Sequence, residues 1–341
     1  MTDAASDRRL ELLREWLVAL APEHDLHVDT LRPASADASF RRYFRIDAGA
    51  ASLIAMDAPP DKEDVRPFIH VASLLRDAGL NAPQVLARDV ARGFLLLTDL
   101  GTTTYLDALR AGGADANALF ADAIDALIRW QLASRTGELP PYDEALLKRE
   151  LMLFPDWYVA RHRGRALSER QRETLEAAFG RILASNLAQP AVYVHRDYMP
   201  RNLMVATPNP GILDFQDAVY GPITYDLASL LRDAFISWDE ERVIDWAVRY
   251  WEKARRARLP VRADFGEFYR DLEWMGLQRH LKVLGIFARI NYRDGKPHYL
   301  ADTPRFVGYV RAVTQRYGEL APLARLIDEV EGVEVRVGYT F

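Results

Sequence analysis

One stretch of the sequence combines acceptor side chains with short apolar runs. Asp197 and Asn202 lie in a loop between two such runs, and Asp214 follows a third run, Gly211–Leu213. Strand ends of this kind deliver side chains to a common place, so the stretch predicts an active site. Carboxylate and amide oxygens suit Mg2+, which proteins usually bind together with substrate phosphates. The chemistry expected here is that of a metal–phosphate site.

Length and composition set the limits for the rest of the chain. The 341 residues exceed what one core usually serves, which favours two lobes. Hydrophobic residues make up 49% and charged residues 27%, as in soluble globular proteins. The net charge of -5 argues against nucleic acid as a partner. The absence of cysteine excludes disulfides and cysteine nucleophiles. No apolar run approaches the length of a membrane span and no signal segment is visible, so we expect a cytoplasmic protein without membrane contact.

The first hundred residues predict a small sheet with helices. Apolar residues at helical spacing from Leu10 to Leu20 predict an amphipathic helix, which Ser6 or Asp7 would cap and Pro22 would end. A polar stretch then reaches Ser35. The other predicted elements are strands 40–46 and 51–56 joined by a turn, a helix over 67–79, and strands 84–87 and 93–98.

The breaker Asp99-Leu100-Gly101 marks the expected boundary between a lobe of residues 1–98 and a lobe of residues 99–341. The second lobe is mainly helical around the strands of the acceptor motif. Its predicted helices cover 120–132, 144–162, 168–187, 225–236, 240–258 and 265–290.

The acceptor motif resembles the catalytic loop of protein kinases. In that pattern His-Arg-Asp is followed after four residues by Asn, here His195 to Asn202, and later by a metal-binding Asp, here Asp214. The continuation Asp214-Phe215-Gln216-Asp217 and the segment 220–228 are closer to the aminoglycoside phosphotransferase family. This resemblance implies an α+β, two-lobed, protein-kinase-like fold that binds ATP and Mg2+ in a cleft.

Within that family, three segments resemble the anomeric kinases that phosphorylate N-acetylmuramate and N-acetylglucosamine at C1 in cell-wall recycling. These segments are 39–45, 97–101 and 195–202. The resemblance implies a kinase whose partners are ATP and a small amino sugar. Two alternatives stay open: a kinase of another small alcohol, such as an aminoglycoside, choline or homoserine, and a nucleotide-binding pseudokinase that acts as a scaffold. We expect a monomer.

Phosphoryl transfer requires positioning and cations more than covalent chemistry. Asp197 is therefore the candidate base that takes the proton of the acceptor hydroxyl, with Asn202 and Asp214 as Mg2+ ligands. By resemblance, His195 supports the loop. Asp226 either anchors the loop through backbone amides or caps its own helix. Asp217 would accept a sugar hydroxyl or serve as a turn residue.

The first lobe departs from the kinase pattern, because the strand Lys of Val-Ala-Ile-Lys is missing. Arginine can clamp phosphate oxygens with two hydrogen bonds, which makes the arginines near residue 40 the substitutes, unless they form a solvated strand face. Leu97 and Asp99 resemble the lobe connection that contacts adenine. The residues expected at the nucleotide are Ser39, Arg41, Arg42, Arg45, Met56, Leu97 and Asp99.

Gln278 and Arg279 are the candidates for the acceptor site in the second lobe, since their side chains can bind sugar hydroxyl or carboxylate groups. A lactyl carboxylate calls for a cation such as Arg279 or Arg161. At helical spacing, however, the neighbouring Trp274, Leu277 and Leu281 first predict a packed helix face.

Overall fold

The computed structural model describes residues 3–35 and 40–333, with side chains from residue 8 onward except that of Ser35. The chain forms two compact units. The first comprises Met1–Ala123 and Arg201–Asp217, and the second comprises Ile124–Pro200 and Ala218–Phe341. The predicted functional lobes, 1–98 and 99–341, stay a prediction.

A five-stranded antiparallel sheet forms the centre of the first unit, in the order β1-β2-β3-β5-β4. Its strands are β1 (Leu26–Ser35), β2 (Arg42–Ala48), β3 (Ala51–Asp57), β4 (Val85–Asp89) and β5 (Phe94–Thr98). The predicted pair of strands around residues 47–50 is confirmed as the β2–β3 hairpin. The expectation of a polar connection up to Ser35 is wrong, because β1 pairs there with β2.

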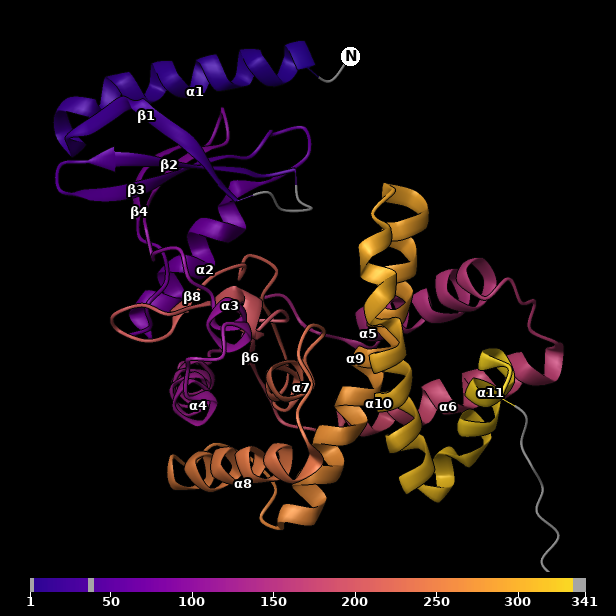
Figure 1. The fold of residues 1–341 in the computed structure, drawn as a ribbon. Coiled ribbons are helices and arrows are strands. Elements are labelled where there is room, and N and C mark those ends of the chain that lie inside the picture. The colour runs from indigo at the N-terminus through magenta and orange to yellow at the C-terminus, as the bar shows by residue number, and fades with distance from the viewer. Residues whose placement is uncertain (1–2, 36–39, 334–341) are drawn as a thin grey trace, which may run out of the picture. The chain divides into compact units, whose positions relative to one another are not determined.

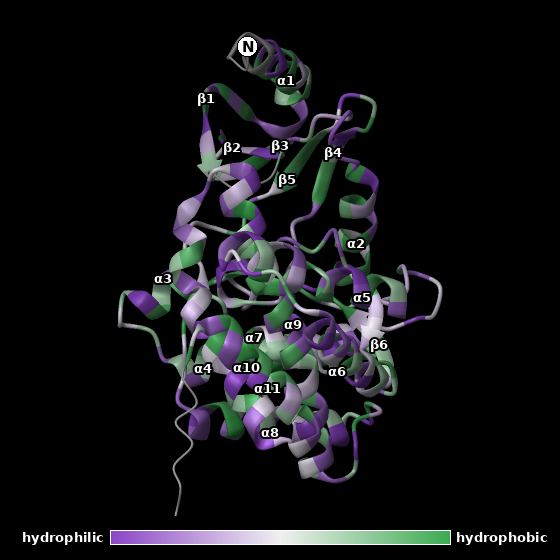
Figure 2. Cartoon of the chain, turned by 90° about the vertical axis from the view of Figure 1, so that its right-hand side faces the viewer, coloured by the Kyte–Doolittle hydropathy of each residue, from purple (hydrophilic) through white to green (hydrophobic). Residues whose placement is uncertain are grey.

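Helix α1 (Asp3–His24) lies along one face of this sheet (Figure 1). It continues two residues past its predicted end at Pro22. Leu13, Trp16 and Leu17 of α1 pack with apolar residues of β1, β2, β3 and β5 into one core cluster. Because residues alternate between faces along a strand, Phe44 and Ile46 of β2 both point into this core. Figure 2 shows β5 in the green of hydrophobic residues, and its residues Phe94–Leu97 are buried.

The remaining parts of the first unit include the later part of the acceptor motif, with Asn202 and Asp214. They include α2 (Val65–Asp77), α3 (Tyr105–Arg110), the start of α4 (Ala116–Leu132), the 3₁₀ turn η2 (Pro200–Asn202) and the hairpin β7 (Leu203–Met204) to β8 (Gly211–Ile212). The Phe68 ring of α2 packs on Phe215, with 4.7 Å between centroids. The segment after β8 is therefore held against α2.

The second unit is mainly helical. Its elements are α5 (Glu144–Leu151), the π-helix η1 (Phe154–His162), α6 (Glu169–Leu187), β6 (Ala191–Val194), β9 (Val219–Pro222), α7 (Tyr225–Leu231), α8 (Glu240–Arg256), α9 (Phe265–Asp294), η3 (Pro297–Asp302), α10 (Thr303–Arg316), η4 (Gly318–Leu320) and α11 (Ala321–Glu331). The predicted helix 144–162 is wrong as a single element, since it divides into α5 and η1. Helix α7 ends five residues early, and α10 and α11 were not predicted.

Helix α9 forms the core of the second unit and packs against α5, α6, α7, α8, α10 and η1. Asp264 caps its start by accepting from the Glu267 amide, and Gly295 ends it in the left-handed conformation. A Cβ placed on Gly285 would lie 2.3 Å from the Leu153 backbone. Only glycine therefore allows this close approach to the chain before η1.

The mixed α+β content expected from the sequence is confirmed. Within the described residues, no helix combines the length and apolar character that crossing a membrane demands.

Candidate active site

The predicted catalytic loop begins directly after β6 in the second unit, where β6 pairs with β9. The imidazole of His195 is buried, and its Nδ1 accepts the backbone amide of Asp197 at 3.3 Å. The ring of Tyr198 meets that imidazole edge-on at 5.6 Å between centroids. His195 thus contacts the backbone of the candidate base, whose own carboxylate is half-buried.

Asp226 contacts the same loop from the first turn of α7. Its Oδ2 accepts the His195 amide at 2.6 Å and its Oδ1 accepts the Arg196 amide at 2.9 Å. The carboxyl group is completely buried. Burial raises the pKa of Asp226 to about 7, although the two amide hydrogen bonds act to lower it. Both carboxylate oxygens are occupied by amides of the loop.

The two candidate metal ligands lie together in the first unit. The β7–β8 hairpin brings the Leu213 amide to the Asn202 carbonyl at 2.9 Å. The Asn202 side-chain amide donates to Asp214 Oδ2 at 3.4 Å, and Gln216 Nε2 donates to Asp214 Oδ1 at 2.9 Å. Asp214 has φ 60°, a left-handed backbone conformation that is uncommon outside glycine and often found at functional sites.

The oxygens of Asn202 and Asp214 are suited to a Mg2+ ion that is also bound by substrate phosphates, rather than to a metal ion bound by protein side chains alone. Among the described residues, no group of three or more His, Asp or Glu side chains is placed to hold a metal ion. Asn202 and Asp214 offer two hard oxygen ligands, and Mg2+ commonly uses one or two carboxylates together with substrate phosphates. The residues present therefore fit an ion that arrives with a nucleotide.

Arg41 lies in the electrostatic range of Asp214. It forms an ion pair with Glu63, with 3.4 Å between Nε and Oε2, and its side chain is largely buried. Burial acts to lower the pKa of Arg41, but Tyr43 and nearby carboxylates raise it above its ordinary value. Those carboxylates are Glu63, Asp214 and Asp217. A buried guanidinium beside a candidate metal ligand is suited to phosphate oxygens.

The sheet separates the other predicted nucleotide residues into two groups. Residues paired directly across antiparallel strands share a face, so the pairing of Arg45 with Ile54 and of Ile54 with Leu97 places Arg45 and Leu97 on one face. Met56 lies on that face two residues along β3. Arg42 lies on the opposite face and binds Asp57, which also pairs with an arginine of α1.

Asp99 is bound by Arg45 and Ser52, two residues of strands β2 and β3. Its carboxylate forms an ion pair with Arg45 and accepts Ser52 Oγ at 2.7 Å and the Gly101 amide at 2.9 Å. Burial acts to raise the pKa of Asp99, but these hydrogen bonds lower it below its ordinary value. Ser39 lies outside the described residues.

Gln278 and Arg279, the candidates for acceptor binding, lie inside the second unit on α9. Their side chains are 0% and 2% exposed. Gln278 Nε2 donates to Glu150 at 3.4 Å and lies 3.5 Å from the Leu147 carbonyl. Asp217, the third candidate, belongs to the first unit and is exposed. The predicted helix packing of this part of α9 is confirmed.

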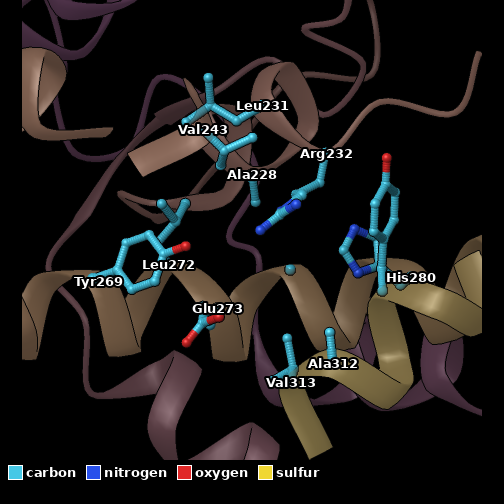
Figure 3. A pocket seen from close by; sticks show the side chains of 12 residues that line it. Ala228, Leu231, Arg232, Val243, Tyr269, Leu272, Glu273, His280, Ala312 and Val313 are labelled. Carbon is cyan, nitrogen blue, oxygen red and sulfur yellow. The ribbon is translucent and has the colours of Figure 1, made fainter. Parts of the chain in front are cut away.

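A small cavity of about 30 Å³ lies among α7, α8, α9 and α10 in the second unit. Figure 3 shows Arg232, Glu273 and His280 among the side chains that line it. This volume suffices for a water molecule and is far too small for an amino sugar. The cavity is therefore not an acceptor site.

Sequence reasoning did not single out Glu150, which pairs with Arg196 of the catalytic loop and with Lys282. It considered Glu63 and Lys282 without assigning them these partners, and the structure pairs Glu63 with Arg41. The sequence carries little signal for the pairing of Glu150 with Lys282, because the two residues are distant in the chain.

The comparisons with known proteins agree with this geometry. An N-acetylmuramate/N-acetylglucosamine kinase of Pseudomonas putida is 52% identical over 334 residues, which cover 95% of this chain and 97% of that protein. A protein of the same name from Neisseria meningitidis serogroup B is also 52% identical, over 96% of this chain and 98% of its own length.

Solved structures show the same fold at low identity. An ADP-bound aminoglycoside phosphotransferase has a TM-score of 0.59 at 13% identity and covers 92% of this chain and 98% of its own. A choline kinase of Cryptosporidium parvum has a TM-score of 0.60 at 9% identity, over 92% and 99%. These likenesses confirm the predicted kinase-like fold. The family described as the phosphotransferase enzyme family matches residues 30–263. The chain therefore belongs to the phosphotransferase enzyme family.

Proposed function

We propose that this protein is an ATP- and Mg2+-dependent kinase that phosphorylates the anomeric C1 hydroxyl of N-acetylmuramate and N-acetylglucosamine in peptidoglycan recycling. The observation that carries the proposal is 52% identity, over nearly the full length, to relatives named for these two sugars. ATP is a cytoplasmic donor, so we also propose a cytoplasmic enzyme, acting as a monomer.

Asp197 is the proposed base in this reaction. It lies on a loop whose backbone is held by His195 and Asp226, so its carboxylate can be presented to a sugar hydroxyl in a defined orientation. Removing the hydroxyl proton as the oxygen attacks the γ-phosphorus favours the transfer. His195 and Asp226 act in this proposal as supports of the loop.

Asn202 and Asp214 would hold Mg2+, which supplies positive charge to the phosphate oxygens of the bound nucleotide. Arg41 would add a second cation near Asp214, in place of the missing strand Lys.

The sheet face that carries Arg45, Met56 and Leu97 would contact the nucleotide, together with Asp99 and Ser39. The ion pair of Arg45 with Asp99 would order this part of the nucleotide site. Arg42 lies on the opposite, α1 face of the sheet, where it binds Asp57.

Asp217, Gln278 and Arg279 are the proposed acceptor residues. Asp217 is exposed and can accept a hydroxyl, while Gln278 and Arg279 would act on the sugar from inside α9 or through the groups they contact. Kinases of aminoglycosides, choline or homoserine remain alternatives for the test below. The aminoglycoside phosphotransferase and the choline kinase compared above resemble this chain in fold, at 13% and 9% identity.

The decisive experiment is a panel of acceptors with ATP, in Mg2+ and in chelator. We expect turnover of N-acetylmuramate and N-acetylglucosamine with Mg2+ only, and a phosphorus NMR spectrum of a C1 phosphate. Asp197→Asn should abolish transfer while nucleotide binding persists. Turnover of choline or an aminoglycoside alone would refute the acceptor, and near-normal turnover by Asp197→Asn would refute the mechanism. ATP binding without turnover of any acceptor would favour a pseudokinase.

A further inference from the structure

Arg196, between His195 and the proposed base Asp197, has an unusual backbone. Its φ of 77° lies in the left-handed region, which is unfavourable for an arginine and persists only where surrounding contacts hold it. Asp226 holds its amide nitrogen, as described above. Its guanidinium lies over the Tyr142 ring, 5.7 Å from the centroid, and donates to Glu150 Oε1 at 2.6 Å.

Glu150 is a buried carboxylate on α5 whose two oxygens are both occupied. Oε1 faces Arg196 and Lys282, the latter at 2.9 Å. Oε2 accepts the Tyr142 hydroxyl and the Gln278 amide, the second at 3.4 Å. Burial acts to raise the pKa of Glu150, but the two cations and the hydrogen bonds lower it to about 2. Glu150 is therefore anionic at neutral pH.

Lys282 is the second cation at this carboxylate. Its side chain is 10% exposed, and Nζ also donates to the Tyr225 hydroxyl at 3.0 Å. Burial acts to lower the pKa of Lys282, but Tyr225, Glu150 and the charge of Asp197 are among the groups that raise it above its ordinary value. The buried Lys282 therefore lies within electrostatic range of Asp197, the proposed base.

Stability alone is a poor explanation for such a cluster. Burying three ions costs desolvation energy, and apolar side chains of similar volume often stabilise a core equally well. The cluster instead joins α5 and α9, two helices far apart in the sequence, to the residue beside the base. Helix α9 belongs to the core of the second unit, so the contact connects the loop to a rigid element.

We propose that Glu150 is a positioning residue of the phosphotransfer reaction, which holds Arg196 and thereby orients Asp197, with Lys282 as its buried counter-cation. This inference rests on the proposed role of Asp197 and adds residues outside the kinase-like motif. The contact is internal to the chain, so the loop is ordered without any modification or partner.

The test compares Glu150→Gln with a matched control, Glu331→Gln. Glu331 also pairs with an arginine, Arg163, and accepts a tyrosine hydroxyl, that of Tyr158. It lies on α11, and both of these partners lie outside the catalytic loop. We measure kcat, the KM for ATP and the KM for whichever acceptor the wild-type protein turns over. We expect Glu150→Gln to lower kcat about 100-fold with KM values within about 3-fold, as for a misplaced catalytic group. Glu331→Gln should keep kcat within about 3-fold.

A kcat of Glu150→Gln within 3-fold of wild type, or no lower than that of Glu331→Gln, would overturn the proposal. Where Glu150→Gln fails to fold, the double variant Glu150→Gln with Lys282→Met removes the uncompensated cation and should fold with the same low kcat. Wild-type kcat in the double variant would equally overturn it. Failure of the wild type on N-acetylated sugars, with turnover of another alcohol, would refute the proposed acceptor and leave this comparison intact.

Discussion

Replacing Asp226 by Asn should separate the stability of the fold from the activity of the site. The carboxyl is completely buried and has its pKa raised from 3.8 to about 7 by burial. Because the folded protein holds this proton more tightly than the unfolded chain, the carboxyl destabilises the fold progressively as pH rises from 4 through 7. The difference between the two pKa values corresponds to about 4 kcal/mol above neutrality.

Asn cannot ionise, so Asp226→Asn removes this pH-dependent cost. Between about pH 5 and about pH 8, the free energy of unfolding of the variant should rise relative to wild type by about 3 kcal/mol, from the same two pKa values. The hydrogen bonds respond differently. Asn has one acceptor oxygen for two loop amides, so either His195 or Arg196 faces an NH2 group. Loss of loop geometry should lower kcat about 100-fold.

Urea unfolding at both pH values measures the stability difference, and ADP release measures kcat. Asp233→Asn is the matched control, since Asp233 is equally buried, has its pKa raised mainly by burial, and accepts the amides of Phe235 and Ile236 away from the loop. It should shift stability in the same direction and keep kcat. A variant at Asp226 that loses stability relative to wild type between pH 5 and 8, or that keeps full kcat, would refute this reasoning.

Three further substitutions probe the site and the core. Asp214→Asn should raise the Mg2+ concentration needed for half-maximal rate at least about 10-fold, since a neutral amide is a poorer ligand; an unchanged Mg2+ titration would contradict the assignment. Arg41→Met should raise the KM for ATP about 10-fold, because a charged contact to phosphate is lost. Arg32→Met is the control, since Arg32 forms an exposed ion pair on the same sheet and its loss should leave this KM unchanged. An equal rise in the KM for ATP in both variants would contradict the role of Arg41. Gly285→Ala should lower the free energy of unfolding by about 3 kcal/mol or more, because its Cβ would overlap the backbone before η1. Gly308→Ala on α10 is the control: its Cβ would meet open space, so the free energy of unfolding in the same urea assay should be unchanged or higher.

Local patterns in the sequence were sufficient to predict several helices and strands of the fold. The β2–β3 hairpin follows from alternation around a turn, and α6, α8 and α9 follow from helical spacing. The spacing from His195 to Asn202 and on to Asp214 predicts a catalytic loop with metal ligands, and the roles of these residues stay a prediction. These signals are local, since each depends on neighbours within a few residues.

Pairing between segments that are distant in the chain could not be predicted from the sequence. β1 was taken as a polar connection, because its pattern makes sense only beside β2 and under α1. The division of 144–162 into α5 and η1 depends on how α9 packs there, as the close approach at Gly285 illustrates.

Tertiary structure also decided which charged residues belong to the site. Arg41, Arg42 and Arg45 look alike in the sequence, yet the pleat sends Arg42 to the α1 face, while Arg41 pairs with Glu63 and Arg45 with Asp99. The ions around Arg196 come from residues 46 and 86 positions away, Glu150 and Lys282. The sequence by itself thus determined the chemistry available at His195–Asp214, because that chemistry is carried by adjacent residues. Only folding decided what orients it, because electrostatic and packing contacts depend on distance in space.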